Sequence, residues 1–380
     1  FHHVSPAAAA SVADNNDAVS FQASWSSVDG LLNSDSKVVQ FDYAAYKAMK
    51  DDVSRTPLFA EAILKRLESA PNGPESQVVV DLGTGPFALF AIVAAQLGAG
   101  KVYAIEGDPY AAASARSTIK KEGWSDIIEV IEGFSTDVTL PEKADFVVAE
   151  IIGSVASEEG AYATIRDAHA RLVKEPNNAN SWIPSRIQTY AAPASYTLHN
   201  LFGPPEFDWG RLKEPVRFNC RDPGLQLLAD PVLVEDISFA NIISKGGTDA
   251  TTTNKQQFQF VVNADRMDEN KKPLAGEFLQ GKTTGQELER LAQSTSHSLS
   301  GIAFWPRLIL DGNDEKIIVN SREYPNGGPK KSHWQTVLPV VSDRPIPLKG
   351  GDTVDLSVEF ELSNVVSKPS LYRINGKVYG

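Results

Sequence analysis

One stretch constrains the fold of this chain more than any other: residues 78–90, an apolar run interrupted by Gly83 and Gly85. It has the pattern of a buried strand, a glycine turn and the start of an apolar helix, and a second apolar run follows and ends on Glu106. An apolar run bounded by glycines and followed by a helical pattern is typical of a parallel α/β unit. The glycines allow a tight turn close to a ligand, and an acid roughly 20 residues further on suits a ribose diol. The stretch predicts a site for a nucleoside cofactor.

The glycine turn departs from the dinucleotide-binding pattern, because Ala88 stands three residues after Gly85 and Asp81 lies just before the turn. Together with Glu106, residues 81–85 resemble motif I of the methyltransferases that use S-adenosylmethionine (SAM). A site for NAD or a flavin is the main alternative. A second alternative is that the segment is only a tight strand-to-helix turn and binds no ligand. We favour the SAM site because Asp81 and Glu106 are both in place.

Strand and helix patterns alternate over residues 78–174, which predicts a doubly wound, mostly parallel sheet of the Rossmann-like kind. After Pro184, short strand-like runs separated by Gly, Pro, Asn and Asp dominate, as in antiparallel barrels and sandwiches. Residues 199–224 break this rhythm with aromatic side chains and are expected to form an inserted arm. The predicted division is a loose tail over residues 1–38, a cofactor domain with N-terminal helices over 39–184 and a β-barrel domain over 185–380.

The 380 residues are 42% hydrophobic and 22% charged, as in a soluble globular protein, and no apolar run approaches the roughly 20 residues of a membrane span. One cysteine, Cys220, excludes an intrachain disulfide framework and suits a reducing compartment, so a cytoplasmic or nuclear protein is expected. The formal net charge of −12 argues against nucleic acid as the main partner and suits a cationic substrate. No residue pattern indicates a metal site.

Acidic residues follow the predicted strand over 144–149, at the sheet edge where such folds bind their ligands. Glu150 and Glu159 are nine residues apart, and a Gly-Ser turn between them can fold the loop so that both carboxylates meet. Two carboxylates in one pocket can clamp a cation. The alternative is a solvated acidic loop, and because Glu158 lies beside Glu159, the second clamp residue is assigned by spacing alone.

Far along the chain, residues 332–334 (Ser-His-Trp) lie between a basic segment and a predicted strand. A lone His-Trp pair is more often part of a packed core than of a catalytic site. In combination with the other features, however, it resembles a loop of the protein arginine N-methyltransferase family. The resemblance covers residues 39–380 and rests on pieces in the same order: a first helix over 46–55, the motif at 81–85, Glu106, the acidic loop over 150–159, the strand over 301–305 and the Ser-His-Trp loop.

The resemblance implies SAM as cofactor, S-adenosyl-L-homocysteine as product and guanidino nitrogens of arginine in protein substrates as methyl acceptors. Arg55 would pair with the carboxylate of SAM, Glu106 would hold the ribose and Ser135 would lie near the adenine. The implied cofactor-binding residues are Met49, Arg55, Asp81, Gly83, Gly85, Glu106 and Ser135. The implied catalytic residues are Glu150, Glu159, His333 and Asp52, and the implied substrate-binding residues are Tyr46 and Trp334.

The resemblance further implies a head-to-tail homodimer in which the arm docks on the partner subunit, and a His333–Asp52 pair across the domain boundary. Residues 40–43 match the family's usual helix start only in part. Tyr46 and the Ser-His-Trp form are closer to the monomethylating (type III) and symmetric (type II) members. Two alternatives stay open: a methyltransferase of the same scaffold that acts on a small molecule, and a non-catalytic scaffold that binds SAM or protein partners.

Overall fold

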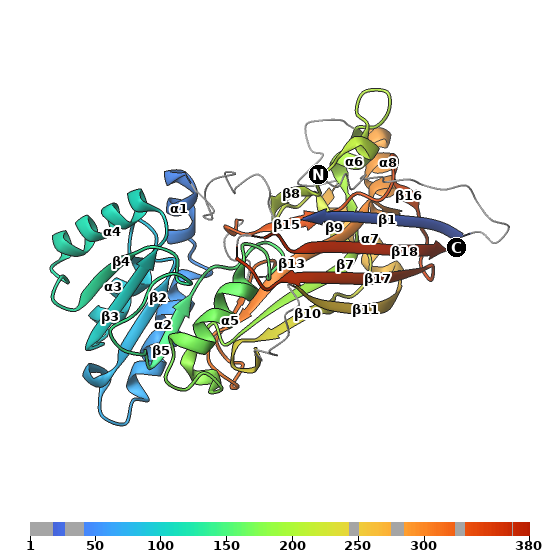
Figure 1. Ribbon diagram of the computed structural model, residues 1–380. Helices are drawn as coiled ribbons and strands as arrows, with labels where there is room; N and C mark the ends of the chain where they lie inside the picture. The colour runs from blue at the N-terminus through green and yellow to red at the C-terminus, as the bar shows by residue number, and fades with distance from the viewer. Residues whose placement is uncertain (1–17, 27–41, 243–250, 275–284, 324–330, 367) are drawn as a thin grey trace.

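The structure is a computed structural model that describes residues 18–26, 42–242, 251–274, 285–323, 331–366 and 368–380. Figure 1 shows an α/β part on the left and a β part on the right. The chain passes from one to the other between β6 (Trp182–Ile183) and β7 (Arg186–Tyr196). Within the described residues, no helix has both the length and the apolar character needed to span a membrane.

A five-stranded parallel sheet in the order β4-β3-β2-β5-β6 forms the centre of the α/β part. Besides β6 it contains β2 (Val78–Leu82), β3 (Lys101–Glu106), β4 (Ile128–Glu132) and β5 (Phe146–Ala149). Every residue of β2 and β5 is buried, which explains why both are apolar apart from Asp81 of β2. The carboxyl ends of β2, β3 and β5 meet at one edge of the sheet, and the candidate site lies there.

The helices of this part connect and cover the strands. They are α1 (Tyr43–Lys50), α2 (Thr56–Glu68), α3 (Leu89–Gln96), α4 (Pro109–Glu122) and α5 (Ala161–Arg171). Asp42 caps α1 by accepting a hydrogen bond from the Ala45 N–H, and Asp108 caps α4 in the same way. The predicted start of the first helix at residues 39–41 lies outside the described residues. The predicted Rossmann-like domain is confirmed.

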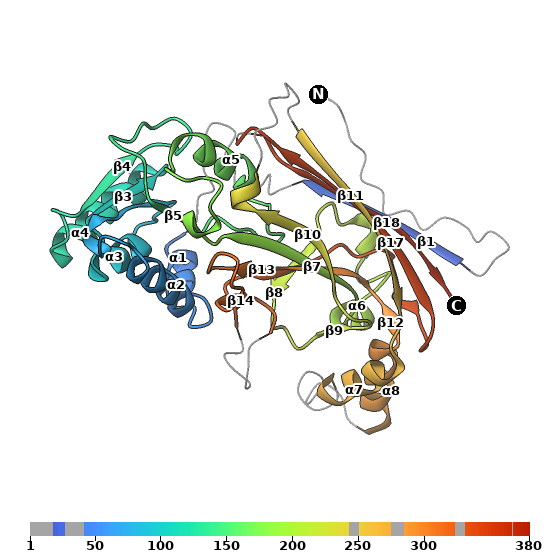
Figure 2. The same ribbon diagram turned by 90° about the horizontal axis from the view of Figure 1, so that it is seen from below.

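The β part consists mainly of two antiparallel sheets, which Figure 2 shows curling around a common interior. The larger sheet has the order β10-β7-β13-β15-β8, and β9 and β14 pair with β7 and β13. Its strands besides β7 are β8 (Val216–Asn219), β9 (Leu225–Leu227), β10 (Val232–Ser238), β13 (Gly301–Ile309), β14 (Ile318–Asn320) and β15 (Gln335–Leu338). The smaller sheet joins β1 (Ala18–Ser26), β18 (Leu371–Tyr379), β17 (Thr353–Ser363) and β11 (Thr251–Val261) in that order. The prediction of an antiparallel β domain after the Rossmann-like domain is confirmed.

The N-terminal tail differs from its prediction, because residues 18–26 are not loose. They form β1, which pairs antiparallel with β18 along its whole length. Phe21 and Trp25 are the two large apolar side chains of this strand, and both are buried. They lie four residues apart, so they point to the same face of a strand, and two aromatic groups are enough to fix it there.

The segment expected to form an arm, residues 199–224, also differs in part. Its last strand-forming residues are β8, which pairs with β15 and belongs to the larger sheet. The preceding part contains the end of α6 (Thr197–Leu201) and a 3₁₀ turn (Trp209–Arg211). The helix α8 (Gly285–Ser296) packs against both α6 and α7 (Ala264–Pro273). A small apolar cluster apart from the main core lies here and consists of Leu201, Leu274, Leu288, Leu291 and Ala292. The arm's role in dimerisation stays a prediction.

Candidate active site

The first of two adjoining cavities opens at the carboxyl ends of the parallel strands and has a volume of about 220 Å³. It contains all of the residues predicted to bind the cofactor, which are Met49, Arg55, Asp81, Gly83, Gly85, Glu106 and Ser135. Tyr46, Glu150 and Glu159 line it as well. Residues that the sequence did not single out complete the wall, among them Phe87, Phe134 and, from the β part, Val366. We call this space the cofactor cavity.

The glycine turn forms the floor of the cofactor cavity. Gly83 and Gly85 have φ values of 70° and 65°, which favour glycine over other residues. A Cβ atom at Gly85 would lie 3.3 Å from Cε1 of Tyr46, tighter than ordinary van der Waals contact. The turn therefore needs glycine both for its backbone conformation and for the close approach of α1.

The two acids of the motif hold this turn in place. Asp81 accepts hydrogen bonds from Thr84 Oγ1 at 2.6 Å and from the Ala91 N–H at 3.0 Å. Burial raises the pKa of Asp81 to about 6, although these hydrogen bonds oppose the rise. Glu106 accepts from the N–H groups of Gly85 and Asp108 at 2.8 and 2.9 Å, and burial also raises its pKa.

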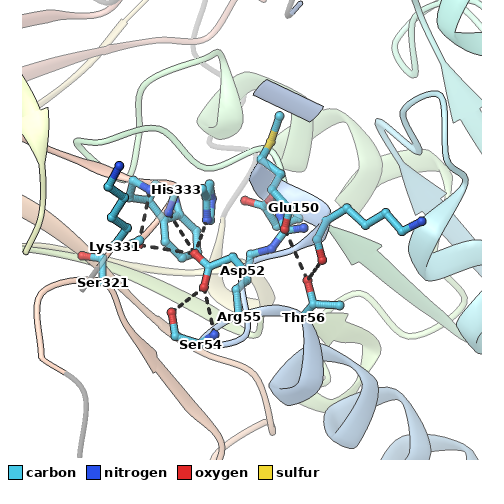
Figure 3. Close-up of polar contacts among 12 residues, drawn as sticks. Asp52, Ser54, Arg55, Thr56, Glu150, Ser321, Lys331 and His333 are labelled. Atoms are coloured by element: carbon cyan, nitrogen blue, oxygen red, sulfur yellow. Dashed lines mark hydrogen bonds and ion pairs between the residues drawn. The ribbon is translucent and has the colours of Figure 1, made fainter. Parts of the chain in front are cut away.

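Arg55, a predicted cofactor-binding residue, contacts Glu150, a predicted catalytic residue. Its guanidinium is buried and forms an ion pair with Glu150, as Figure 3 shows. The guanidinium also lies over the rings of Phe59 and Phe90, at 5.9 and 5.2 Å from their centroids. Among the described residues, no group accepts a hydrogen bond from the buried Nε of Arg55. The cofactor cavity thus contains a cation with unused hydrogen-bonding capacity.

A second cavity of about 220 Å³ adjoins the first, and we call it the acceptor cavity. Its lining includes Ser154, Arg217, His333, Trp334 and Gln335. Met49, Glu150 and Glu159 line both cavities. The two acids predicted to form a clamp therefore stand where the cavities meet.

The neighbouring acids Glu158 and Glu159 have different environments. Glu158 is buried and receives two hydrogen bonds from the guanidinium of Arg217, at 2.6 and 3.1 Å, and one from the Val155 N–H at 3.0 Å. Glu159 has no ion-pair or hydrogen-bond partner among the described residues. Burial raises the pKa of Glu159 to about 8, and the nearby carboxylates of Glu150 and Glu158 add to the rise. The unpaired acid at the junction is Glu159, the residue assigned by spacing.

The predicted contact between Asp52 and His333 is present in the structure. His333 Nδ1 lies 2.8 Å from Asp52 Oδ2, and the backbone N–H of His333 donates to the same oxygen at 2.9 Å (Figure 3). Ser54 donates to the other oxygen through its N–H at 2.9 Å. Burial alone would raise the pKa of Asp52, but the hydrogen bonds from His333 and Ser54 outweigh it and hold the pKa well below its usual range. Burial lowers the pKa of His333.

Trp334 anchors the same loop to the α/β part. Its buried Nε1–H donates to the carbonyl oxygen of Ile152 at 2.9 Å, and the next residue, Gln335, donates its N–H to Ser154 Oγ at 3.2 Å. The Ser-His-Trp loop therefore connects the helix region before Arg55 with the loop after β5. Among the predicted residues, only Asp52 lines neither cavity, and it lies behind His333.

The sequence reasoning missed Arg217 and Arg221. Arg217 lies on β8, inside the segment expected to be an arm, and fixes Glu158. Arg221 donates to Ser54 Oγ at 3.0 Å and to the Lys331 carbonyl at 3.3 Å, so it supports the Asp52 contact from the β part. No motif marks either residue. The alternation of Val216, Arg217 and Phe218 was the only available sign of a strand.

Parts of the sequence are similar to known methyltransferases. Residues 60–163 match the family model for ribosomal protein L11 methyltransferase (PrmA). The chain is 32% identical over 192 residues to protein arginine N-methyltransferase PRMT10 of Arabidopsis thaliana, covering 47% of this chain and 48% of that protein. It is 31% identical over 154 residues to protein arginine N-methyltransferase 7 of Rattus norvegicus, covering 39% of this chain and 22% of that protein. Over these stretches the chain is similar to protein arginine N-methyltransferases.

Solved structures of arginine methyltransferases share the fold. The chain matches Arabidopsis thaliana protein arginine methyltransferase 10 with a TM-score of 0.59 and 19% identity, covering 89% of this chain and 97% of that one. It matches the Trypanosoma brucei PRMT1 enzyme-prozyme heterotetrameric complex with AdoHcy with a TM-score of 0.59 and 16% identity, covering 84% and 88%. In sequence, the match spans about half or less of the curated arginine methyltransferases named above.

Proposed function

We propose that this protein is a SAM-dependent protein arginine N-methyltransferase. The observation that carries the proposal is the position of Glu150 and Glu159, which line both the cofactor cavity and the acceptor cavity. A methyl donor bound in the first cavity and a guanidinium bound in the second would meet at these two carboxylates. The related arginine methyltransferases support this choice of acceptor.

The residues of the cofactor cavity fit SAM. The unpartnered Nε of Arg55 offers a hydrogen bond to the carboxylate of the amino acid moiety, and the glycine turn lines the space in which the nucleoside would bind. Glu106 lies at the end of β3, where an acid can accept from ribose hydroxyls, and Ser135, which lines the same cavity, would lie near the adenine. Bound SAM supplies an electrophilic methyl group on a sulfonium, and S-adenosyl-L-homocysteine is the product.

The acceptor side suits a guanidinium ion. Arginine stays protonated at ordinary pH, with a pKa above about 12, so two carboxylates are the expected partners. Glu150 already binds one guanidinium in this structure, that of Arg55. When Glu150 and Glu159 hold one edge of the substrate guanidinium, they draw positive charge toward that edge. The nitrogen at the other edge is then freer to attack the methyl group. The methyl–sulfur bond breaks as the nitrogen–methyl bond forms, and the proton that this nitrogen gives up passes to solvent; positioning and electrostatics lower the barrier.

His333 and Asp52 act on the geometry of this site. Because the pKa of His333 is lowered and that of Asp52 is lowered too, the pair consists of a neutral imidazole and a carboxylate near pH 7. The contact fixes the turn that carries Arg55 against the loop that carries Trp334. We infer that His333 orients the two domains and that Tyr46 and Trp334 contact the substrate.

Partners follow from the same proposal. The substrates are arginine-containing proteins or peptides, and the part of the arm before β8 serves a homodimer. The Trypanosoma brucei relative is a heterotetrameric complex, which supports assembly through this fold. A cytoplasmic or nuclear location and a type III or type II product remain part of the proposal.

The test is mass spectrometry of an Arg-Gly-rich peptide after incubation with SAM. We expect arginine to gain a methyl group, and Glu150→Gln to abolish the gain while SAM affinity stays within a few-fold. Glu122→Gln, an exposed acid at the end of α4, is the matched control and should leave the gain unchanged. If the intact protein adds no methyl to arginine yet binds SAM, the small-molecule methyltransferase or the non-catalytic scaffold takes the place of this proposal.

A further inference from the structure

The loop that carries Glu159 is held from behind by buried groups of the β part. Tyr372 on β18 is fully buried, and its hydroxyl lies 3.0 Å from Ser157 Oγ. Its ring is stacked on Trp25 of β1, with centroids 5.5 Å apart, and meets Phe360 of β17 edge-on at 5.1 Å. The ring cannot turn away without disrupting this packing, so the hydroxyl has a fixed position. It contacts Ser157, which precedes Glu159 by two residues.

A second buried contact reaches the same loop from the larger sheet. The backbone N–H of Ala156 donates to Thr189 Oγ1 on β7 at 3.0 Å. Thr189 in turn donates to Glu235 Oε2 on β10 at 2.7 Å. Thr189 and Glu235 are both buried, and burial raises the pKa of Glu235 to about 7. The Glu235 carboxyl thereby sets the direction of the Thr189 hydroxyl, whose lone pairs face the loop.

Glu159 depends on such support because its own conformation is uncommon. Its φ is 63°, in the left-handed region that side chains other than glycine rarely adopt. Such a backbone conformation persists only where the surrounding structure holds the residue in place. Since Glu159 has no ion-pair or hydrogen-bond partner among the described residues, the backbone of residues 155–160 decides where its carboxylate points.

We propose that Tyr372, Thr189 and Glu235 are positioning residues for the Glu159 carboxylate, an inference that rests on the proposed function. None of the three lines the cofactor cavity or the acceptor cavity, so they act on the reaction only through the loop. The N-terminal strand takes part, because Trp25 packs on the ring of Tyr372. The β part thus does more than bind substrate: it sets the geometry of the clamp.

The experiment combines hydrogen exchange with kinetics for Tyr372→Phe and Thr189→Val. Tyr372→Phe removes the contact with Ser157, Thr189→Val removes the hydrogen bonds to Ala156 and Glu235, and both changes keep the shape of the side chain. A net hydrogen bond is worth about 1 kcal/mol, so amide exchange in peptides covering residues 150–160 should become roughly five- to tenfold faster. We expect kcat with an Arg-Gly-rich peptide to fall at least as much, while the dissociation constant for SAM stays within twofold.

Ser195→Ala is the matched control. Ser195 lies on β7 like Thr189 and is equally buried, but its hydroxyl donates to the Thr295 carbonyl, away from the loop. It should leave exchange in residues 150–160 and kcat unchanged. Should Tyr372→Phe fail to fold, Ser157→Ala removes the same hydrogen bond from the other side.

The outcomes separate the two proposals. Unchanged exchange in residues 150–160 in both variants overturns the positioning role, whatever the activity. Faster exchange with unchanged kcat also overturns it, because the clamp then tolerates a looser loop. If the intact protein methylates no arginine, the proposed function fails, while the exchange data still decide whether these residues hold the loop.

Discussion

The raised pKa of Glu159 leads to a specific pH dependence of acceptor binding. Without bound ligands the pKa is about 8, and burial is the largest cause, followed by the carboxylates of Glu150 and Glu158. A guanidinium binds the ionised form of this acid, so acceptor affinity should increase as pH rises through the pKa. The acceptor arginine itself stays charged over this range, because its pKa lies above about 12.

The size of the effect follows from the ionised fraction. With a pKa of about 8, about one Glu159 in eleven is ionised at pH 7 and about ten in eleven at pH 9. The apparent KM for the peptide should therefore fall about tenfold between these two pH values. His333 should not contribute, because its lowered pKa leaves it neutral throughout. Glu235, with a pKa of about 7, titrates within the range as well, and because it lines neither cavity it acts on Glu159 only through the loop.

The assay is the initial rate of methyl transfer against peptide concentration at saturating SAM, from pH 6.5 to pH 9.5. Isothermal titration with the Glu159→Gln variant should show weak peptide binding that no longer changes with pH. The exposed control Glu122→Gln should keep the wild-type profile. An apparent KM that stays flat over this range, or a pH dependence retained in Glu159→Gln, would refute the reasoning.

Three other predictions test separate parts of the site. Arg55→Ala should weaken SAM binding at least tenfold by calorimetry, and Arg55→Lys should not restore it, because a point charge cannot replace a guanidinium fork; unchanged binding would remove Arg55 from the cofactor site. Glu158→Gln should lower kcat far less than Glu159→Gln, because Glu158 is already paired with Arg217; equal losses would contradict the assignment of the clamp. Deletion of residues 202–212 should give monomers by light scattering, and a persistent dimer would place the interface elsewhere.

Much of the fold could be predicted because the local pattern and the final environment agree. The run that begins at Val78 is apolar except for Asp81, and β2 is buried on both faces, so no alternation was needed to recognise it. The polar composition of residues 246–254 and 268–285, which favours loops, shows the limit. Residues 251–254 are part of β11, and 268–273 are part of α7. Both segments are polar because the strand and the helix are largely exposed, and exposure leaves little apolar pattern to read.

Some residues of the candidate site could be predicted from the sequence and others could not. Residues in short motifs with fixed spacing, such as those of the glycine turn, could be named because the chemistry depends on neighbours in sequence. The contact between Asp52 and His333 could be stated only through a family resemblance, since 281 residues separate them. Arg217 and Tyr372 could not be found at all. Each is one side chain on an ordinary strand, and its partner lies far away in the chain.

The sequence by itself determined the parallel sheet, the glycine turn and the presence of acids after β5, because periodicity and short-range spacing encode these features. Only the tertiary structure decided which acid is free. Arg217 arrives from another domain and neutralises Glu158, whereas the left-handed backbone at Glu159 points its carboxylate to the junction of the cavities. Charge pairing and burial depend on groups that meet only when the chain is folded, and they set the pKa on which the proposed reaction depends.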